Sequence, residues 1–114
     1  MISNKGGIYM FKIEIYTPEK YIHEIIEEAN ELGACKVGDY DYVSSYYEIN
    51  GSFRPLEGSD PYSGEKDKIN LLKEYKIEIR CEEKKLKKVV NKIKEIHPYE
   101  EPVINIIKLY NYLL

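Results

Sequence analysis

The segment HPYEEPVINI, which begins at His97, holds the residue types best suited to chemistry in this sequence. One imidazole and two carboxylates lie close together there, and such groups bind divalent metal ions. His97, Glu100 and Glu101 are therefore candidate metal ligands. A complete site needs more ligands, and no second cluster of His, Cys, Asp or Glu supplies them. In the alternative interpretation the segment is a structural corner, in which Pro98 ends a helix and Tyr99 packs locally.

A second candidate is the loop NGSFRPLEGSDPYSGEK, which spans residues 50–66. Its glycines would let backbone N–H groups approach an anion, with Arg54 or Lys66 as a charged partner. The loop lacks the P-loop pattern, so the alternative is a hairpin connection that needs positive φ at Gly51, Gly58 or Gly64. A long loop in a compact domain is often functional, and we expect this one to meet a small-molecule ligand or a protein partner. The candidate contact residues are Gly51, Phe53, Arg54, Gly58, Pro61 and Gly64.

Catalysis has little support in the residue pattern. No serine or cysteine stands beside a histidine in a nucleophile motif. His23 shares the polar face of the predicted first helix with Glu27 and Asn30, so we expect it to be solvated. Cys35 and Cys81 lie in no metal-binding or redox motif, and we expect two unpaired thiols in a reducing compartment. We therefore expect no enzymatic activity from this chain.

Length and charge limit the class of protein. The 114 residues suffice for one hydrophobic core, and we expect a single domain over residues 10–114 after a flexible extension over residues 1–9. The net charge of -3 provides no positive field for nucleic acid or an anionic membrane. No apolar run approaches the roughly 18 residues that span a bilayer, so we expect a cytoplasmic protein without membrane contact.

Alternating apolar residues predict four strands. The last of them is β-branched on both sides, which is typical of a largely buried strand. A further short strand at Ser52–Arg54 is an option within the long loop. The predicted strands are Met10–Tyr16, Tyr40–Ile49, Ile69–Cys81 and Pro102–Leu109.

Apolar residues at helical spacing predict two helices between these strands. Thr17 would cap the first helix, Pro18 would take its first position, and Gly33 would form a left-handed cap at its end. The second helix is predicted over Glu82–Ile96 and ends before Pro98.

The order β-α-β-β-α-β is the ferredoxin-like arrangement, an α+β fold with two helices on one face of an antiparallel sheet. The other face then needs a cover, because the second and fourth strands carry apolar or aromatic residues on both sides. Self-association would provide it, and the twelve tyrosines suit an interface. We therefore expect a homo-oligomer.

Three motifs together resemble the PII/CutA-like domain inserted in many bacterial proteins of the Nif-three-like family. They are G-x-Y at Gly38, G-x-F-x-P-x-x-G-x-x-P-x-x-G from Gly51 to Gly64, and HPYEE from His97. The resemblance covers about residues 10–109. The HPYE corner also resembles, more distantly, the trimeric CutA proteins linked to divalent-cation tolerance. This chain differs from them because it lacks tryptophan and carries the glycine–proline loop in place of their middle hairpin.

The resemblance implies a ferredoxin-like fold, a trimer as the default assembly, and a ligand or partner at the long loop. It implies no catalytic residue here, since full-length Nif-three-like proteins resemble dinuclear-metal hydrolases whose metal ligands lie in flanking domains. The leading hypothesis is a non-catalytic, self-associating module that binds a small ligand or partner as a regulator. The competing hypothesis is divalent-metal binding through His97 and Glu100 or Glu101. A third hypothesis is an enzyme whose partner chain supplies the missing domain.

Overall fold

The computed structural model describes residues 9–110 of the chain. A short 3₁₀ helix precedes the first of two α-helices, and four strands complete the fold. In chain order the elements are β1 (Met10–Thr17), η1 (Glu19–Tyr21), α1 (Ile22–Glu31), β2 (Ser44–Phe53), β3 (Asn70–Glu82), α2 (Glu83–Ile96) and β4 (Ile104–Leu109).

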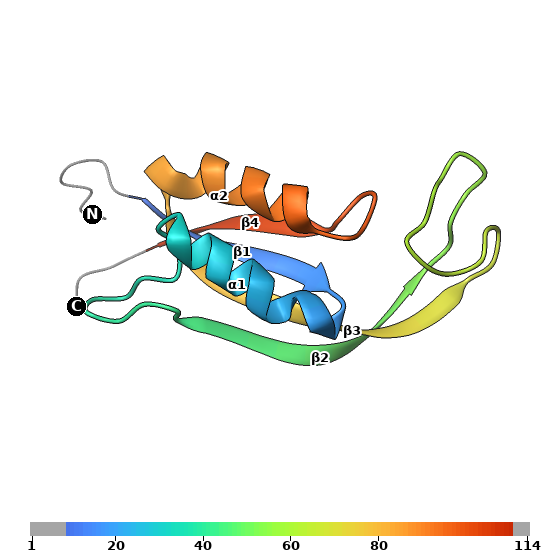
Figure 1. Cartoon of the computed structure of the whole chain (residues 1–114), viewed down its shortest axis with the longest axis horizontal. Coiled ribbons are helices and arrows are strands. Elements are labelled where there is room, and N and C mark those ends of the chain that lie inside the picture. The colour runs from blue at the N-terminus through green and yellow to red at the C-terminus, as the bar shows by residue number, and fades with distance from the viewer. Residues whose placement is uncertain (1–8, 111–114) are drawn as a thin grey trace.

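The strands form one antiparallel sheet in the order β2-β3-β1-β4. Ile13 of β1 lies opposite Ile79 of β3 on one side and Ile106 of β4 on the other. Both α-helices pack on the same face of this sheet, as Figure 1 shows. The predicted ferredoxin-like α+β fold is therefore confirmed.

The core lies between the two helices and the sheet face that they cover. Ile13, Ile15, Ile77 and Ile79 alternate along β1 and β3 and are at most 2% exposed. Each buried isoleucine contributes about 2 kcal/mol of hydrophobic stabilisation. The helices contribute Ile22, Ile25, Ile26, Ala29, Val89, Val90 and Ile93. The strand and helix periods in the sequence therefore indicate the core correctly.

The first helix begins later than predicted. Thr17 is the last residue of β1 and is fully buried, and its hydroxyl donates to the carbonyl O of Pro18 (3.1 Å) instead of capping a helix. The N–H of Tyr21 also donates to that oxygen (3.2 Å) to close a 3₁₀ turn, and α1 begins at Ile22. At the other end Gly33 has φ of +102°, the left-handed cap that the sequence predicted.

The second strand is shifted along the chain relative to its prediction. It begins at Ser44, because Tyr42 has a positive φ of 56° that interrupts an extended chain. Tyr40, the predicted start, pairs only with Val37 in an isolated bridge. The strand continues to Phe53, so the optional short strand is simply the end of β2.

The fourth strand is less buried than predicted. It occupies an edge of the sheet, beside β1 alone. Ile106 and Ile107, on opposite faces, are 45% and 40% exposed. The expectation of a largely buried strand is therefore wrong for the isolated chain.

Ion pairs cover the centre of the sheet face opposite the helices. Glu14 lies 3.1 Å from Lys12 and 3.4 Å from Lys76, and Lys76 also lies 3.7 Å from Glu78. Asn105 donates a further hydrogen bond to Glu14 (3.2 Å). Burial by itself raises the pKa of Glu14, but these hydrogen bonds outweigh it and hold the pKa below its usual value. Glu14 is therefore a buried, fully partnered carboxylate.

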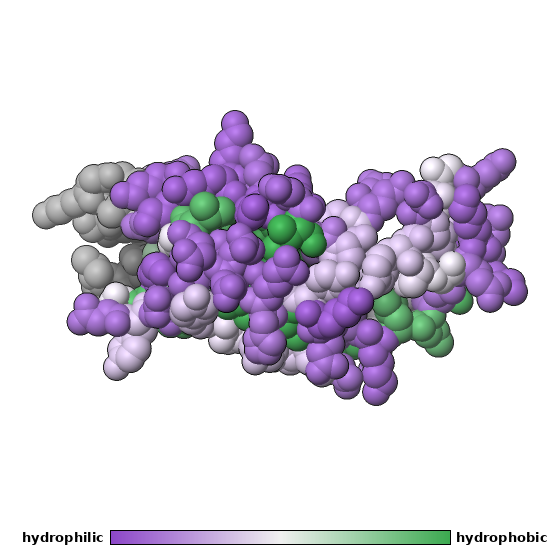
Figure 2. Space-filling model, viewed as in Figure 1, coloured by the Kyte–Doolittle hydropathy of each residue, from purple (hydrophilic) through white to green (hydrophobic). Residues whose placement is uncertain are grey.

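Hydrophobic side chains come to the surface at the distal part of the β2–β3 ribbon. Figure 2 shows that the surface over the helices is mostly hydrophilic, with hydrophobic residues near that ribbon. Ile69 and Leu71 are 71% and 82% exposed there. Neither described helix is long and apolar enough to cross a membrane.

Most of the predicted N-terminal extension, residues 1–8, lies outside the described residues. Tyr9, also placed in that extension, contacts the fold. Its carbonyl oxygen accepts the N–H of Glu83 (2.9 Å), and Lys108 Nζ lies 3.7 Å from its ring centroid. Tyr9 is therefore attached to the end of the sheet and to the start of α2.

The polar face of α1 contains one residue that is buried. His23 is exposed, as predicted, with its ring 6.4 Å from that of Tyr46. Asn30 is buried, contrary to its predicted place on the solvated face. Its Oδ1 accepts the backbone N–H of Tyr42 (2.8 Å) and an Nζ hydrogen of Lys36 (3.2 Å). Asn30 therefore attaches the connection before β2 to the end of α1.

Replacing Asn30 should lower the free energy of unfolding, because it removes this attachment. Asn30→Ala leaves the Tyr42 N–H without its acceptor, and we expect a loss of about 1–3 kcal/mol in the free energy of unfolding. Urea unfolding followed by circular dichroism measures it. Asn50→Ala, at an exposed position of β2, should change the stability by less than about 0.5 kcal/mol. Equal stability of the two variants would contradict this role.

Candidate functional site

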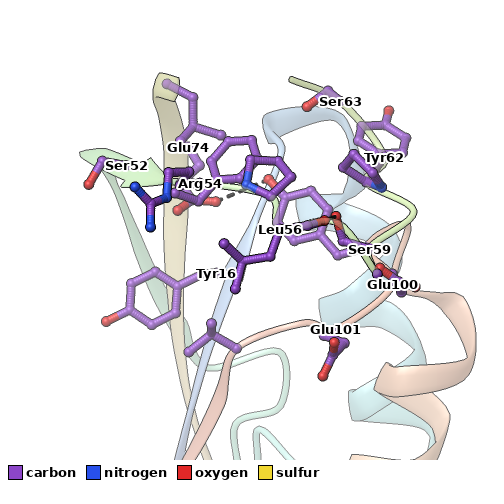
Figure 3. Close-up of a pocket in the computed structure, with 17 residues that line it drawn as sticks. Tyr16, Ser52, Arg54, Leu56, Ser59, Tyr62, Ser63, Glu74, Glu100 and Glu101 are labelled. Atoms are coloured by element: carbon purple, nitrogen blue, oxygen red, sulfur yellow. Dashed lines mark hydrogen bonds between the residues drawn. The ribbon is translucent and has the colours of Figure 1, made fainter. Parts of the chain in front are cut away.

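The long loop after β2 and the corner after α2 come together at one end of the sheet. Between them lies a cavity of about 550 Å³, drawn in Figure 3. Its lining combines aromatic, apolar, hydroxyl and charged side chains from four segments of the chain. The lining residues are Tyr16, Ser52, Phe53, Arg54, Pro55, Leu56, Gly58, Ser59, Pro61, Tyr62, Ser63, Leu72, Glu74, Tyr99, Glu100, Glu101 and Val103.

Two hydrogen bonds and a ring contact hold this end of the molecule together. The backbone N–H of Asp60, in the loop, donates to Glu100 Oε1 (2.9 Å). The ring of Tyr62 lies 5.8 Å from that of Tyr99, centroid to centroid. Tyr99 in turn donates its hydroxyl hydrogen to Glu74 Oε2 of β3 (3.1 Å). The loop is thereby tied to the corner, and the corner to the sheet.

His97 forms the base of the corner rather than the wall of the cavity. It is 7% exposed, and its Nε2 lies 2.7 Å from the carbonyl oxygen of Tyr16. Because a carbonyl only accepts, Nε2 must carry the hydrogen. Its Nδ1 then accepts the backbone N–H of Tyr99 (3.1 Å). The ring therefore joins the end of α2 to β1 and sets the direction of the chain towards Glu100.

The charge states of the corner follow from burial. Burial lowers the pKa of His97, and the hydrogen bond to the Tyr16 carbonyl only partly offsets this. Burial, together with the neighbouring carboxylate of Glu74, raises the pKa of Tyr99. At neutral pH the imidazole is neutral and the phenol is protonated. Both are the forms that the observed hydrogen bonds require.

These residues do not fit a metal site as they stand. Both ring nitrogens of His97 are engaged with backbone groups, so neither offers a free lone pair. Glu100 binds the loop backbone, and Glu101 lies on the cavity side. Nowhere in residues 9–110 do three His, Cys, Asp or Glu side chains gather as a metal site requires. The metal ligand set predicted from HPYEE remains a prediction without support from this geometry.

The sequence candidates divide into those that line the cavity and those that do not. Phe53, Arg54, Gly58, Pro61, Tyr99, Glu100 and Glu101 line it. Gly51, Gly64, Pro98 and His97 do not. Two motifs more than 30 residues apart in the sequence thus meet in one site, because the loop folds back onto the corner.

The glycines of the loop differ in backbone conformation and in the space around them. Gly64 has φ of +91°, and a Cβ there would lie 2.7 Å from the Phe53 ring, so this position requires glycine. Gly51 lies within β2, and its Cβ would lie 3.0 Å from Glu74 Oε1. Among the three candidates for positive φ, Gly64 alone adopts it.

The sequence patterns did not indicate several of the residues that line the cavity. Tyr16 and Glu74 belong to strands whose pattern only indicated a solvated face. Leu56 and Tyr62 lie within the loop and are exposed. Large apolar and aromatic residues among glycines and prolines were the sequence feature that could have indicated a binding surface there. Val103 follows Pro102 directly and was assigned to the last strand. Their shared cavity depends on contacts between distant segments.

The two cysteines lie elsewhere, in the core. Both are buried and unpaired, as predicted. Burial raises the pKa of each thiol to about 11, so neither is a thiolate at neutral pH. They are therefore poor nucleophiles and poor metal ligands in the folded chain.

Known proteins place this geometry in context. Residues 64–112 match the family model described as CutA1 divalent ion tolerance protein. A GTP cyclohydrolase 1 type 2 homolog of Staphylococcus epidermidis is 34% identical over 106 residues, which are 93% of this chain and 29% of that protein. The corresponding homolog of Halalkalibacterium halodurans is 30% identical over 102 residues, 90% of this chain and 27% of its own. The chain thus spans less than a third of these curated relatives.

Solved structures of CutA and of a protein related to NIF3 are similar to this chain as well. A Bacillus cereus protein related to NIF3 superposes with a TM-score of 0.79 at 25% identity, over 90% of this chain and 26% of that one. The periplasmic divalent cation tolerance protein CutA of Archaeoglobus fulgidus superposes with a TM-score of 0.68 at 20% identity, over 91% and 87% of the two chains. The chain has a CutA-like fold. The resemblance indicated by its motifs, to CutA and to proteins related to NIF3, is confirmed. In the longer relatives this CutA-like part is a minor fraction of the whole.

The buried imidazole of His97 should make stability fall in mild acid. The folded state binds its proton less tightly than the unfolded state, whose pKa is near 6.5. The free energy of unfolding should therefore be highest above pH 6.5 and decrease as the pH falls below it. Urea unfolding at pH 7.5 and 5.5 measures this. His97→Gln should flatten the dependence, whereas His23→Gln, at an exposed position, should retain it.

A substitution of His97 distinguishes a structural role of this residue from metal binding. His97→Ala removes two hydrogen bonds and leaves a void, so we expect a loss of about 2–4 kcal/mol in the free energy of unfolding. The folded fraction of this variant should give the same calorimetric response to Zn²⁺ as the wild type, because His97 is not expected to be a ligand. Loss of Zn²⁺ binding from a variant of unchanged stability would instead restore His97 as a ligand.

Proposed function

We propose that this chain is a non-catalytic, self-associating module that binds a small molecule in the cavity between its long loop and its HPYEE corner. The observation that carries the proposal is the convergence of these two motifs on one cavity of about 550 Å³. Volumes of about 300–1,000 Å³ are typical of small-molecule sites. A regulatory role, in which the bound ligand changes how the module meets a partner, is part of the same proposal.

The lining supports a specific site rather than a packing defect. Apolar walls from Leu56, Leu72 and Val103 stand beside the polar groups of Arg54 and Glu74. Few well-placed polar groups within an apolar lining are typical of ligand pockets. The hydrogen bond from Asp60 N–H to Glu100 Oε1 also limits the motion of the loop, which reduces the entropy lost on binding.

Self-association through the sheet face opposite the helices is the second part of the proposal. Tyr47 of β2 and Ile107 of β4 flank the central ion pairs there and are partly exposed. An apolar margin around a charged centre suits an interface in which charges fix the register. The proposed assembly is a trimer, which is what the resemblance to CutA and PII-type proteins implies.

Two leucines test the cavity. Leu56 lines it and Leu71 does not, although both are exposed. We expect members of a soluble fragment library to shift the amide resonances of Gly58 and Tyr99 in the wild type. Leu56→Arg should weaken such binding at least tenfold by filling the cavity with charge, and Leu71→Arg should leave it unchanged. A library without a single binder, or equal effects of the two variants, would count against the site.

Two neighbouring isoleucines test the interface. Ile106 faces the helices and Ile107 the opposite side, at similar exposure. Ile107→Lys should shift the native mass spectrum towards monomer at micromolar concentration, because it places a charge in the apolar margin. Ile106→Lys should leave the assembly intact. A wild-type chain that is monomeric under these conditions would overturn this part of the proposal.

A further inference from the structure

Two charged side chains of the cavity have no partner within the described chain. Glu74 accepts the hydroxyl hydrogen of Tyr99, and Glu100 accepts the backbone N–H of Asp60. Arg54 and Glu101 line the same cavity, and neither makes a hydrogen bond or ion pair with residues 9–110. Both residues are exposed, so each charge can meet a ligand group of the opposite sign in a charge-assisted hydrogen bond.

These two charges stand on different walls. Arg54 directly follows β2, whereas Glu101 belongs to the segment between the corner and β4. In Figure 3 they lie on opposite sides of Leu56. No ion pair joins the Arg54 guanidinium and the Glu101 carboxylate, although both residues line the cavity.

The surface between the charges is apolar and aromatic. Leu56 and Val103 contribute aliphatic groups, and Tyr16 contributes an aromatic ring. A ligand that reached from one charge to the other would therefore pass its central part over hydrophobic surface. The gain from that contact would add to the two charged interactions at its ends.

We propose that the cavity binds a small zwitterion, with its anionic group at Arg54, its cationic group at Glu101 and an apolar or aromatic body between them. This inference rests on the proposed function of the cavity and names the class of its ligand. Short peptides with free termini, and amino-acid derivatives whose charges lie at opposite ends, have this chemistry. A planar carboxylate suits the guanidinium of Arg54, and an ammonium group suits the carboxylate of Glu101.

The same lining disfavours polyanions such as nucleoside triphosphates. Three carboxylates, Glu74, Glu100 and Glu101, face one guanidinium in the cavity. A triphosphate would meet more negative than positive charge, and such like-charge contacts reject a ligand. The site therefore discriminates by sign as well as by shape.

The test uses the dipeptide Phe-Gly in three forms: with free termini, N-acetylated, and C-amidated. Titration by calorimetry with the native assembly gives the affinity of each. For the wild type we expect each cap to weaken binding about tenfold, since each removes one charge-assisted interaction. ATP should bind more weakly than the free dipeptide.

Variants that remove one charge each show which side chain binds which end of the ligand. Arg54→Gln should no longer distinguish the free carboxylate from the amide, and Glu101→Gln should no longer distinguish the free amine from the acetylated form. Glu57→Gln, in the same loop but outside the cavity, should behave as the wild type. If the variants at Arg54 and Glu101 retained both preferences, the assignment would be wrong.

The result separates the two proposals. If neither Phe-Gly nor its capped forms bind while a library fragment does occupy the cavity, the zwitterion is overturned and the binding function stands. If no compound shifts the resonances of Gly58 and Tyr99, both are overturned. Binding of ATP at the cavity more tightly than the free dipeptide would also overturn the ligand class.

Discussion

The hydrogen-bonded imidazole of His97 is the interaction on which the functional end of this molecule depends. It is buried between the carbonyl group of Tyr16 and the N–H of Tyr99, so it joins β1 to the chain that leaves α2. The corner then presents Tyr99 to Glu74 and Glu100 to the loop. A histidine that would suggest catalysis or metal binding by its type alone thus acts through two hydrogen bonds to the backbone.

The two faces of the sheet are stabilised in different ways. Isoleucines fill the face under the helices, where burial alone provides the driving force. On the opposite face Glu14 is buried among Lys12, Lys76 and Asn105 and finds a partner for its charge. Such a network contributes little net stability, because the attraction between the charges is offset by the cost of removing them from water.

The CutA-like fold gives no indication of chemistry by itself, since one fold supports many functions. In this chain the loop after β2 folds back onto the corner, and a cavity lies between them. The 106 matched residues are 29% of the Staphylococcus epidermidis relative, so this chain corresponds to a minor part of it. The proposed binding of a small molecule rests on the aromatic walls and opposite charges of this cavity.

The sequence by itself determined the order of the main elements, the core isoleucines and the left-handed cap at Gly33, because each depends on a period or a local conformation. It also identified both motifs that line the cavity. The tertiary structure decided that Asn30 is buried, that Tyr16 supplies the acceptor for His97, and that Glu74 meets Tyr99. These contacts join residues far apart in the chain, and their partners are chosen by strand order and register. No local sequence pattern specifies these partners, so a class of ligand could be inferred only from the folded structure.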